Sequence, residues 1–151
     1  MFFVRLSLIA TSLLLFLSSC SKNEDIASTI PDRCLLVSGV NSKVELHQFI
    51  QEAIEAFEAR DLHKIKLLSG ASLRVNFKGS KAILQTQEEF EEYRSKIFAA
   101  TVIDQAIFMK SKEKLAKLFC RDIGAMFGNG AVWIGSNEAG SPELIAINSD
   151  S

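Results

Sequence analysis

The chain has 151 residues, and its 17 basic and 18 acidic side chains give a formal net charge of −1. Such a balance disfavours nucleic-acid binding, which requires a clustered basic surface. The densest basic group lies in residues 110–117, where Glu113 interrupts it, and this arrangement is typical of a solvated helix face. We therefore expect no nucleic-acid partner.

The first twenty residues have the pattern of a secretion signal. Arg5 is the only charged residue before Lys22, and residues 6–17 are almost continuously apolar. A helix of this length extends about 18 Å at about 1.5 Å per residue, whereas the hydrocarbon core of a membrane is about 30 Å thick. The segment therefore predicts a signal peptide over residues 1–19 and not a membrane-spanning helix.

The end of this segment, Leu17-Ser18-Ser19-Cys20, resembles the lipobox of bacterial prolipoproteins, in which an aliphatic and two small residues precede a cysteine. Small side chains fit an extended backbone in a peptidase site, and a thiol is needed for the thioether to diacylglycerol. The resemblance implies that Cys20 becomes the lipidated first residue, whose two or three acyl chains, such as palmitate, anchor the protein stably to a membrane. The alternative is an ordinary secretion signal with a cysteine at the cut by chance.

The residue after the cysteine bears on which membrane is used. Ser21 stands where an aspartate often marks retention in the inner membrane of enteric-type bacteria. The resemblance therefore implies the outer membrane, with the protein facing the periplasm and attached to the bilayer through its N-terminal lipid.

Removal of residues 1–19 leaves 132 of the 151 residues, enough for one compact domain and too few for two. The segment after Cys20 is mostly polar, with Ile26 and Ile30 as its larger apolar side chains. We expect residues 20–33 to be a lipidated N-terminus and flexible tether. Residues 34–151 then form a single globular domain.

Cys34 and Cys120 are the two cysteines that remain once Cys20 is acylated. A disulfide between them can persist in an oxidising compartment. It would close a loop of about 86 residues, for which the chain-entropy model gives about 4–5 kcal/mol of stabilisation. The alternative is a pair of buried free thiols that pack as small hydrophobes. The even number of cysteines and the predicted compartment favour the disulfide.

Apolar residues at three- and four-residue spacing predict helices along the first two thirds of the chain. Ser42 and Glu45 fit a capping box at the start of the clearest helix. Thr86 and Glu89 fit a second capping box. The predicted helices span residues 42–60, 62–68, 86–97, 102–107 and 112–119.

Strands are predicted where the period changes to two, as at Leu73, Val75 and Phe77. Asn129-Gly130 suits a type I′ turn, which needs positive φ at both positions. In that register Met126 opposes Trp133, and the next pair is residues 127 and 132. The predicted strands span residues 73–77, 82–84, 123–127, 131–135 and 144–147, and the first turn is placed at Gly79-Ser80.

This order of elements resembles the nuclear-transport-factor-2-like or cystatin-like α+β fold. Residues 35–148 also resemble a group of uncharacterised bacterial secreted proteins through Glu89-Phe90, Ile97-Phe98 and the hairpin from Gly124 to Ile134. The resemblance implies N-terminal helices packed on a curved antiparallel sheet that encloses a conical pocket. Some proteins of this shape are isomerases or dehydratases and many others only bind or assemble, so the fold alone does not select a function.

Few residues are candidates for acid–base chemistry. An isomerase needs a buried carboxylate as base and an acid that stabilises an oxyanion, and Asp104, Asp122 and Tyr93 are the available types. A polar helix face accounts for Asp104, and an ion pair or turn contact accounts for Arg121-Asp122. We therefore assign no catalytic residue.

The remaining candidates are two histidines and one tryptophan. His47 and His63 have no further ligand pattern, whereas zinc needs three or four converging ligands. We expect boundary or surface histidines and neither a metal nor another cofactor. Trp133, the only tryptophan, could anchor a partner, but packing in the core is favoured because a lone tryptophan in an apolar strand usually fills it.

These observations predict a non-enzymatic, membrane-tethered domain that binds a protein or another envelope component. An inhibitor of a cell-wall-directed enzyme, or an immunity protein against one, is a concrete version. The alternative is an enzyme or small-ligand carrier that uses the cone of the fold. No oligomeric state is predicted. The candidate pocket or binding residues are Tyr93, Asp104, Arg121, Asp122 and Trp133.

Overall fold

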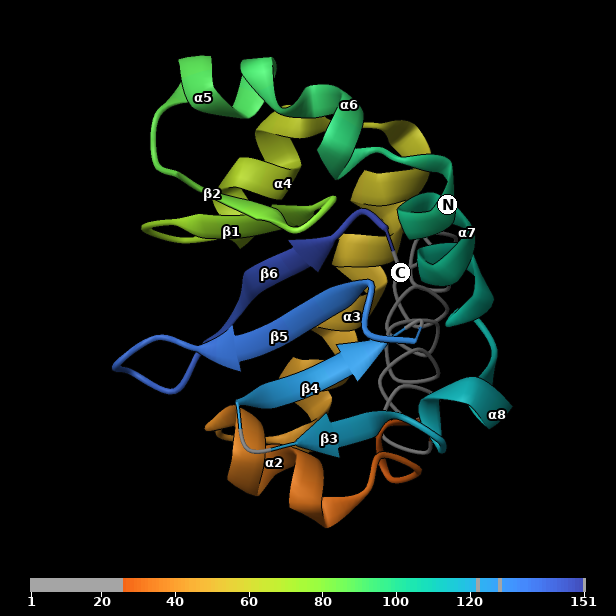
Figure 1. Cartoon of the computed structure of the whole chain (residues 1–151). Helices are drawn as coiled ribbons and strands as arrows, with labels where there is room; N and C mark the ends of the chain where they lie inside the picture. The colour runs from red at the N-terminus through yellow and green to blue at the C-terminus, as the bar shows by residue number, and fades with distance from the viewer. Residues whose placement is uncertain (1–25, 122, 128, 151) are drawn as a thin grey trace, which may run out of the picture.

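The computed structural model describes residues 26–121, 123–127 and 129–150 (Figure 1). The helices are α2 (Asp32–Ser38), α3 (Lys43–Ala59), α4 (Leu62–Leu68), α5 (Gln87–Glu92), α6 (Arg94–Ile97), α7 (Ala100–Phe108) and α8 (Lys112–Leu115). The strands are β1 (Leu73–Phe77), β2 (Ser80–Leu84), β3 (Phe119–Arg121), β4 (Gly124–Phe127), β5 (Val132–Ser136) and β6 (Pro142–Asn148). The predicted α+β class is confirmed.

The six strands form one sheet in the order β2-β1-β6-β5-β4-β3. Four of the neighbouring pairs are antiparallel, but β1 and β6 are parallel, with Arg74 opposite Ala146. The prediction of an antiparallel sheet is therefore wrong at this pair. The reason is topological, because the last strand returns between the β1–β2 hairpin and β5, and periodicity reports strands and not their neighbours.

The local signals for helix starts and hairpins are confirmed. The Ser42 hydroxyl accepts a hydrogen bond from the Glu45 N–H at 3.1 Å, and both bonds of the capping box are present between Thr86 and Glu89. Met126 lies opposite Trp133 as predicted, and Asn129 and Gly130 have φ of 41° and 89°. These features succeed because they depend only on residues close in sequence.

The turn between β1 and β2 differs from the prediction by one residue. Lys78 and Gly79 have φ of 44° and 73°, and Phe77 pairs with Ser80. Ser80 therefore begins the strand instead of completing the turn. This is the positive-φ pattern of a two-residue hairpin.

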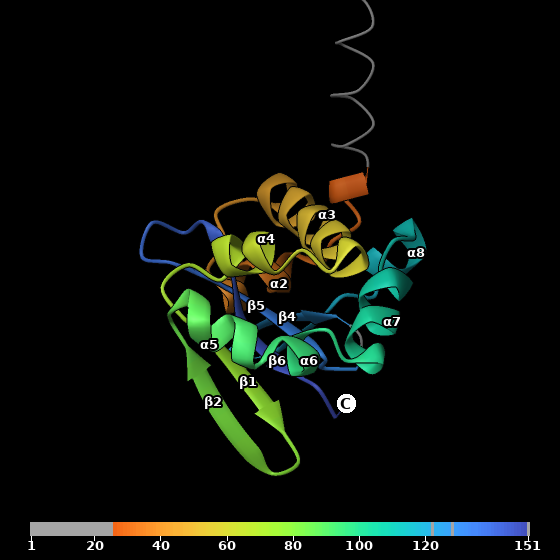
Figure 2. The ribbon, with the colours of Figure 1, turned by 90° about the horizontal axis from the view of Figure 1, so that it is seen from above.

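The helices cover one face of the sheet (Figures 1 and 2). The long α3 packs against α4, α7 and β6, and α2 packs against β3, β4 and β5. Between the layers lies a single apolar core, to which every strand contributes buried residues. Its largest fully buried side chains include Phe57, Phe90, Phe127, Leu46, Ile50, Ile65 and Leu118.

The domain begins before residue 34, so the predicted boundary of the tether is wrong. Ala27 and Ile30 are both 1% exposed, and α2 begins at Asp32. The prediction was wrong because the composition of this segment is mostly polar, whereas its two apolar side chains are buried in the core. Of the predicted tether, residues 20–25 lie outside the described residues.

The helix predicted over residues 112–119 ends at Leu115, and β3 begins at Phe119. Leu118 is buried, and Cys120 is bonded to Cys34 of α2 with 5.2 Å between the Cα atoms. The disulfide is the one predicted. Helical spacing gave a wrong prediction for residues 116–119, because the contact of this segment with the distant α2 favours a strand instead of a longer helix.

Candidate functional site

The face of the sheet opposite the helices is called the open face, and it presents one side chain per strand in a continuous row. The row follows from the strand register and runs from one edge strand to the other. The two residues at its ends, Ile83 and Phe119, are 51% and 46% exposed. In strand order the row is Ile83, Arg74, Ala146, Trp133, Met126 and Phe119.

Two glycines flatten the open face beside this row. Gly135 and Gly124 lie on neighbouring strands, and Ile145, at an irregularity in the β5–β6 register, packs 3.0 Å and 3.5 Å from where their Cβ atoms would stand. Gly124 has φ of 149°, and a side chain there would also collide with the Ile134 carbonyl oxygen. An aliphatic side chain thus lies flat across β4 and β5 next to Trp133.

Trp133 lies on the open face and not in the core, so the favoured core placement is wrong. Its neighbours Val132 and Ile134 are fully buried on the helix side, whereas Trp133 is half-buried. The indole N–H donates to the Gly130 carbonyl oxygen at 3.0 Å. The Asn148 amide donates to the same oxygen at 2.6 Å. The indole bond restricts the orientation of the ring, which lowers the entropy cost of using it as a contact, and the Asn148 bond holds the carbonyl group that accepts it.

Phe119 and Arg121 lie on the open face at the β3 edge, and a residue of α2 joins them. The guanidinium carbons of Arg33 and Arg121 each lie 5.8 Å from the centroid of the Phe119 ring. This distance is within the range of a cation–π contact. Arg121 and Trp133 are therefore on the same face, which the sequence did not reveal.

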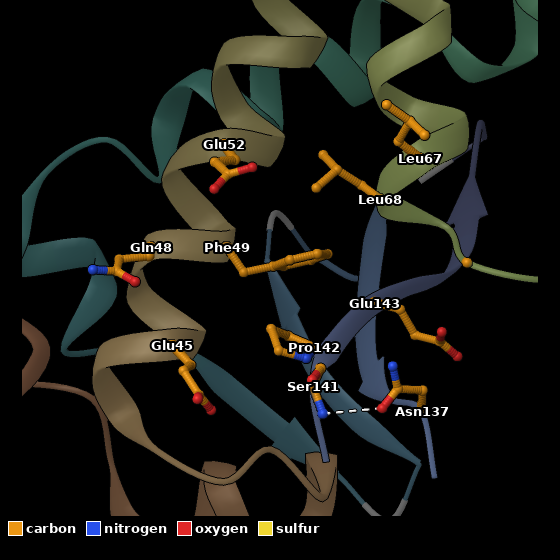
Figure 3. A pocket seen from close by; sticks show the side chains of 11 residues that line it. Glu45, Gln48, Phe49, Glu52, Leu67, Leu68, Asn137, Ser141, Pro142 and Glu143 are labelled. Atoms are coloured by element: carbon orange, nitrogen blue, oxygen red, sulfur yellow. Dashed lines mark hydrogen bonds between the residues drawn. The ribbon is translucent and has the colours of Figure 1, made fainter. Parts of the chain in front are cut away.

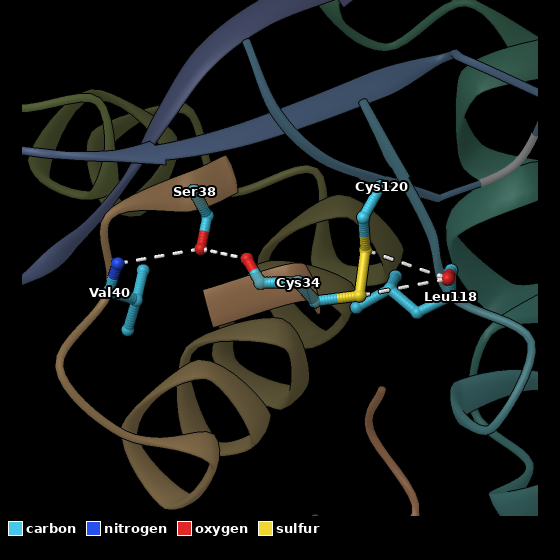
Figure 4. Close-up of a disulfide and its surroundings, with 5 residues drawn as sticks. All are labelled: Cys34, Ser38, Val40, Leu118 and Cys120. Carbon is cyan, nitrogen blue, oxygen red and sulfur yellow. Dashed lines mark hydrogen bonds between the residues drawn. A yellow bond between two sulfur atoms is a disulfide. The ribbon is translucent and has the colours of Figure 1, made fainter. Parts of the chain in front are cut away.

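The disulfide fixes this edge of the sheet (Figure 4). Cys34 follows Arg33 in α2, and Cys120 stands between Phe119 and Arg121 in β3. The Ser38 hydroxyl donates to the Cys34 carbonyl oxygen at 2.5 Å and accepts from the Val40 N–H at 3.4 Å, which closes the end of α2. The two arginines are thus held on elements that are covalently joined.

The other predicted site residues do not converge. Tyr93 packs against Phe77 with 5.6 Å between ring centroids, on the helix side. Asp104 is exposed on α7, and Asp122 and Cys20 lie outside the described residues. Between the described helices and the sheet the space is filled by apolar side chains such as Phe57 and Phe127. The structure therefore lends no support to a cone lined by Tyr93 and Asp104.

His63 is exposed, as expected, but His47 is 1% exposed, so its predicted boundary position is wrong. Neither ring nitrogen of His47 has a hydrogen-bond partner within the described part of the chain. Burial lowers the pKa of the His47 imidazole, because the charged form loses its hydration. No group of three or more His, Cys, Asp or Glu side chains suited to a metal is present among the described residues.

A groove that the sequence did not predict lies between α3, α4 and the β5–β6 turn (Figure 3). It has a volume of about 370 Å³, with Phe49, Leu68 and Pro142 as apolar walls and Glu45 at its rim. The Asn137 side-chain oxygen shapes the turn by accepting from the Ala139 and Ser141 N–H groups. The sequence signal for this turn is the set of turn-forming residues Asn137, Gly140 and Ser141.

Comparison with known proteins identifies no relative: no family model, no curated protein and no solved structure matches the chain. Within the described ranges, no helix is both long and apolar enough to cross a membrane.

Proposed function

We propose that this chain is a lipid-anchored protein of the bacterial envelope whose domain binds a protein partner through the open face. The observation that carries the proposal is the row of apolar and aromatic side chains, with arginines beside it, on a sheet face that the helices leave uncovered (Figures 1 and 2). Within the row, Trp133, Met126 and Phe119 lie on neighbouring strands and stay at least partly exposed, and contiguous exposed apolar surface marks interaction sites. Aromatic residues and arginine are also the types enriched where binding energy is concentrated.

The anchoring part of the proposal is supported by the sequence Leu17-Ser18-Ser19-Cys20. Lipidation at Cys20 would place the domain on the outer membrane, facing the periplasm. An oxidising compartment of this kind is also where a disulfide such as Cys34–Cys120 persists.

The position of the first described residues supports an orientation away from the bilayer. Figure 2 shows the first described residues, at the orange start of the coloured ribbon, on the same side of the sheet as α3. Cys20 precedes Ile26 by six residues, which span at most about 20 Å when fully extended. The anchor would thus join the molecule on the side opposite the open face, leaving that face free for a partner. Inhibition of a cell-wall-directed enzyme, or immunity against one, is a function of this type.

Anchoring is tested by intact-mass analysis and membrane fractionation of the wild type, Cys20→Ala and the control Ser21→Ala. We expect acyl chains on wild type and Ser21→Ala, both in the membrane fraction, and none on Cys20→Ala. An unlipidated, soluble wild type would remove the location argument.

Binding is tested by placing a photo-crosslinking phenylalanine analogue at Phe119 and, as a matched control, at Phe108 of α7. The two side chains have similar exposure, 46% and 52%, but Phe108 lies on α7, in the helix layer. We expect crosslinks to one recurring envelope protein from position 119 and not from 108. Equal crosslinking at both positions, or none at 119, would contradict the proposal.

A further inference from the structure

The cluster of Arg33, Phe119 and Arg121, called here the arginine–phenylalanine cluster, brings two positive charges to one aromatic ring. Both guanidinium carbons are 5.8 Å from the ring centroid, so they are separated by no more than twice that distance. An anion that lies between or beside the two guanidinium groups is attracted by both charges. The cluster therefore favours an anionic ligand.

The two guanidinium groups have no anionic partner in the described structure. The neighbouring Asp32 carboxylate pairs with Lys43 at 2.6 Å, and none of the ion pairs or hydrogen bonds among the described residues involves either guanidinium. Each guanidinium offers a planar fork of donors that matches a carboxylate in two parallel hydrogen bonds. Both forks are exposed and remain available.

Basic side chains outnumber acidic ones on the described strands of the open face, with Arg74, Lys81 and Arg121 against Glu143. Of these, only Arg121 belongs to the cluster, because Arg74 and Lys81 lie on β1 and β2, at the other end of the sheet from β3. Glu143 lies at the far end of β6, next to Gly70. The chain as a whole carries a net charge of −1, so the positive character is local to this face.

The backbone segments that carry the cluster are fixed relative to each other before any ligand binds. The Cys34–Cys120 bond joins the residue after Arg33 to the residue between Phe119 and Arg121. Beyond Phe119, Met126 and the hydrogen-bonded Trp133 continue the row at the spacing of adjacent strands. A ligand on this face would therefore contact two positive charges at the β3 edge and an apolar strip beside them.

We propose that the occupant of the open face is an acidic protein segment, whose carboxylates bind Arg33 and Arg121 while its apolar side chains lie on Phe119, Met126 and Trp133. This inference rests on the proposed function, which assigns a protein partner to this face, and adds the chemistry of that partner. Arginine residues also bind anionic lipid headgroups. The protein segment is favoured because Met126 and Trp133, which it would cover, lie on the sheet face opposite the helix layer, in which the first described residues begin.

The first experiment selects peptides from a random phage-displayed library on the full-length lipidated protein held in nanodiscs. We expect the selected peptides to be rich in Asp and Glu next to apolar residues. Their affinity should fall at least tenfold on Arg33→Gln/Arg121→Gln. The control Arg60→Gln/Lys66→Gln, which removes the same charge at α3 and α4, should leave affinity unchanged.

The outcomes separate the inference from the proposed function. Some selected peptides could lose affinity on Phe119→Ala or Trp133→Ala and yet carry no excess of Asp and Glu, or be insensitive to the arginine substitutions. Either result would overturn the inference of an acidic partner but would support the open face as the binding surface. Peptides insensitive to all four substitutions would count against the binding face itself.

The second experiment uses Trp133, the only tryptophan of the chain, to test contact with the bilayer. The lipidated protein is placed in vesicles that contain brominated phosphatidylglycerol, whose bromine atoms quench nearby tryptophan fluorescence. We expect no quenching by the brominated lipid and a spectral change when a selected acidic peptide is added. Quenching by the lipid, relieved by Arg33→Gln/Arg121→Gln, would assign the cluster to the membrane and overturn the inference.

Discussion

The two faces of the sheet use the same alternation of residues for different purposes. On the helix side, Phe127, Val132 and Ile134 are buried and form part of one core. On the open face, Phe119, Met126 and Trp133 come from the same strands and stay at least partly exposed. Hydrophobicity at period two therefore identifies strands on both faces, whereas coverage by the helices determines which apolar side chains stabilise the fold and which remain available to a partner.

The largest expected effect compares phenylalanines from the two faces. Phe127→Ala removes a fully buried ring, and we expect a loss of about 3–5 kcal/mol in the free energy of unfolding, because it leaves a cavity. Phe119→Ala should cost less than about 1 kcal/mol, since the ring is half in solvent. Urea denaturation followed by circular dichroism measures both. Similar losses for the two variants would show that the open face is covered in solution.

The disulfide joins α2, in the helix layer, to β3, the edge strand of the open face. Its removal therefore tests how much the stability of this edge depends on the bond. We expect Cys34→Ala/Cys120→Ala to lower the free energy of unfolding by about 2–5 kcal/mol, because the unfolded chain regains the freedom of a long loop. The same denaturation experiment under reducing conditions should reproduce the loss in the wild type and leave the double variant unchanged. A wild type insensitive to reduction would contradict this prediction.

Burial of His47 should lower the free energy of unfolding at acidic pH. Its pKa is lowered in the folded state, so below about pH 6.5, the ordinary value for histidine, the unfolded chain binds a proton that the folded chain does not. Stability therefore falls as the pH falls through that value, and above it His47 contributes no pH dependence. In His47→Leu this part of the pH dependence should disappear.

The matched control for this prediction is His63→Leu, which changes an exposed histidine and should keep the wild-type pH profile. Denaturation midpoints measured between pH 5 and pH 8 compare the three proteins. Identical profiles for His47→Leu and the wild type would contradict the buried, unpartnered state of His47.

The smallest effect is expected for the arginine–phenylalanine cluster. Arg33→Gln/Arg121→Gln should change the free energy of unfolding by less than about 0.5 kcal/mol, because exposed cations that form no ion pair with any described residue contribute little to stability. A large loss in the same denaturation assay would show that the cluster is structural, and it would weaken the assignment of these residues to a partner.

Part of the candidate site could be predicted from the sequence. Trp133 and Arg121 were identified as binding candidates, and the pairing of Met126 with Trp133 followed from the Asn129-Gly130 turn. Arg33 is not a candidate from the sequence, because its surroundings predict a flexible tether, and Phe119 is not one, because it lies at the end of a predicted helix. Each of these two positions depends on the other through Cys34–Cys120, a contact that no local pattern reports.

Local patterns in the sequence predict the elements whose causes are local: the capped helices α3 and α5, the two hairpins and the α+β class, and Leu17-Ser18-Ser19-Cys20 carries the resemblance that implies a lipidated Cys20. No local pattern predicts that β6 lies parallel to β1, that residues 26–33 join the domain, that His47 is buried or that the described helices leave one sheet face uncovered. The physical reason is range. Caps, turns and periodicity act over a few residues, whereas strand order, burial and the meeting of α2 with β3 arise from segments that the folded chain brings together across most of its length.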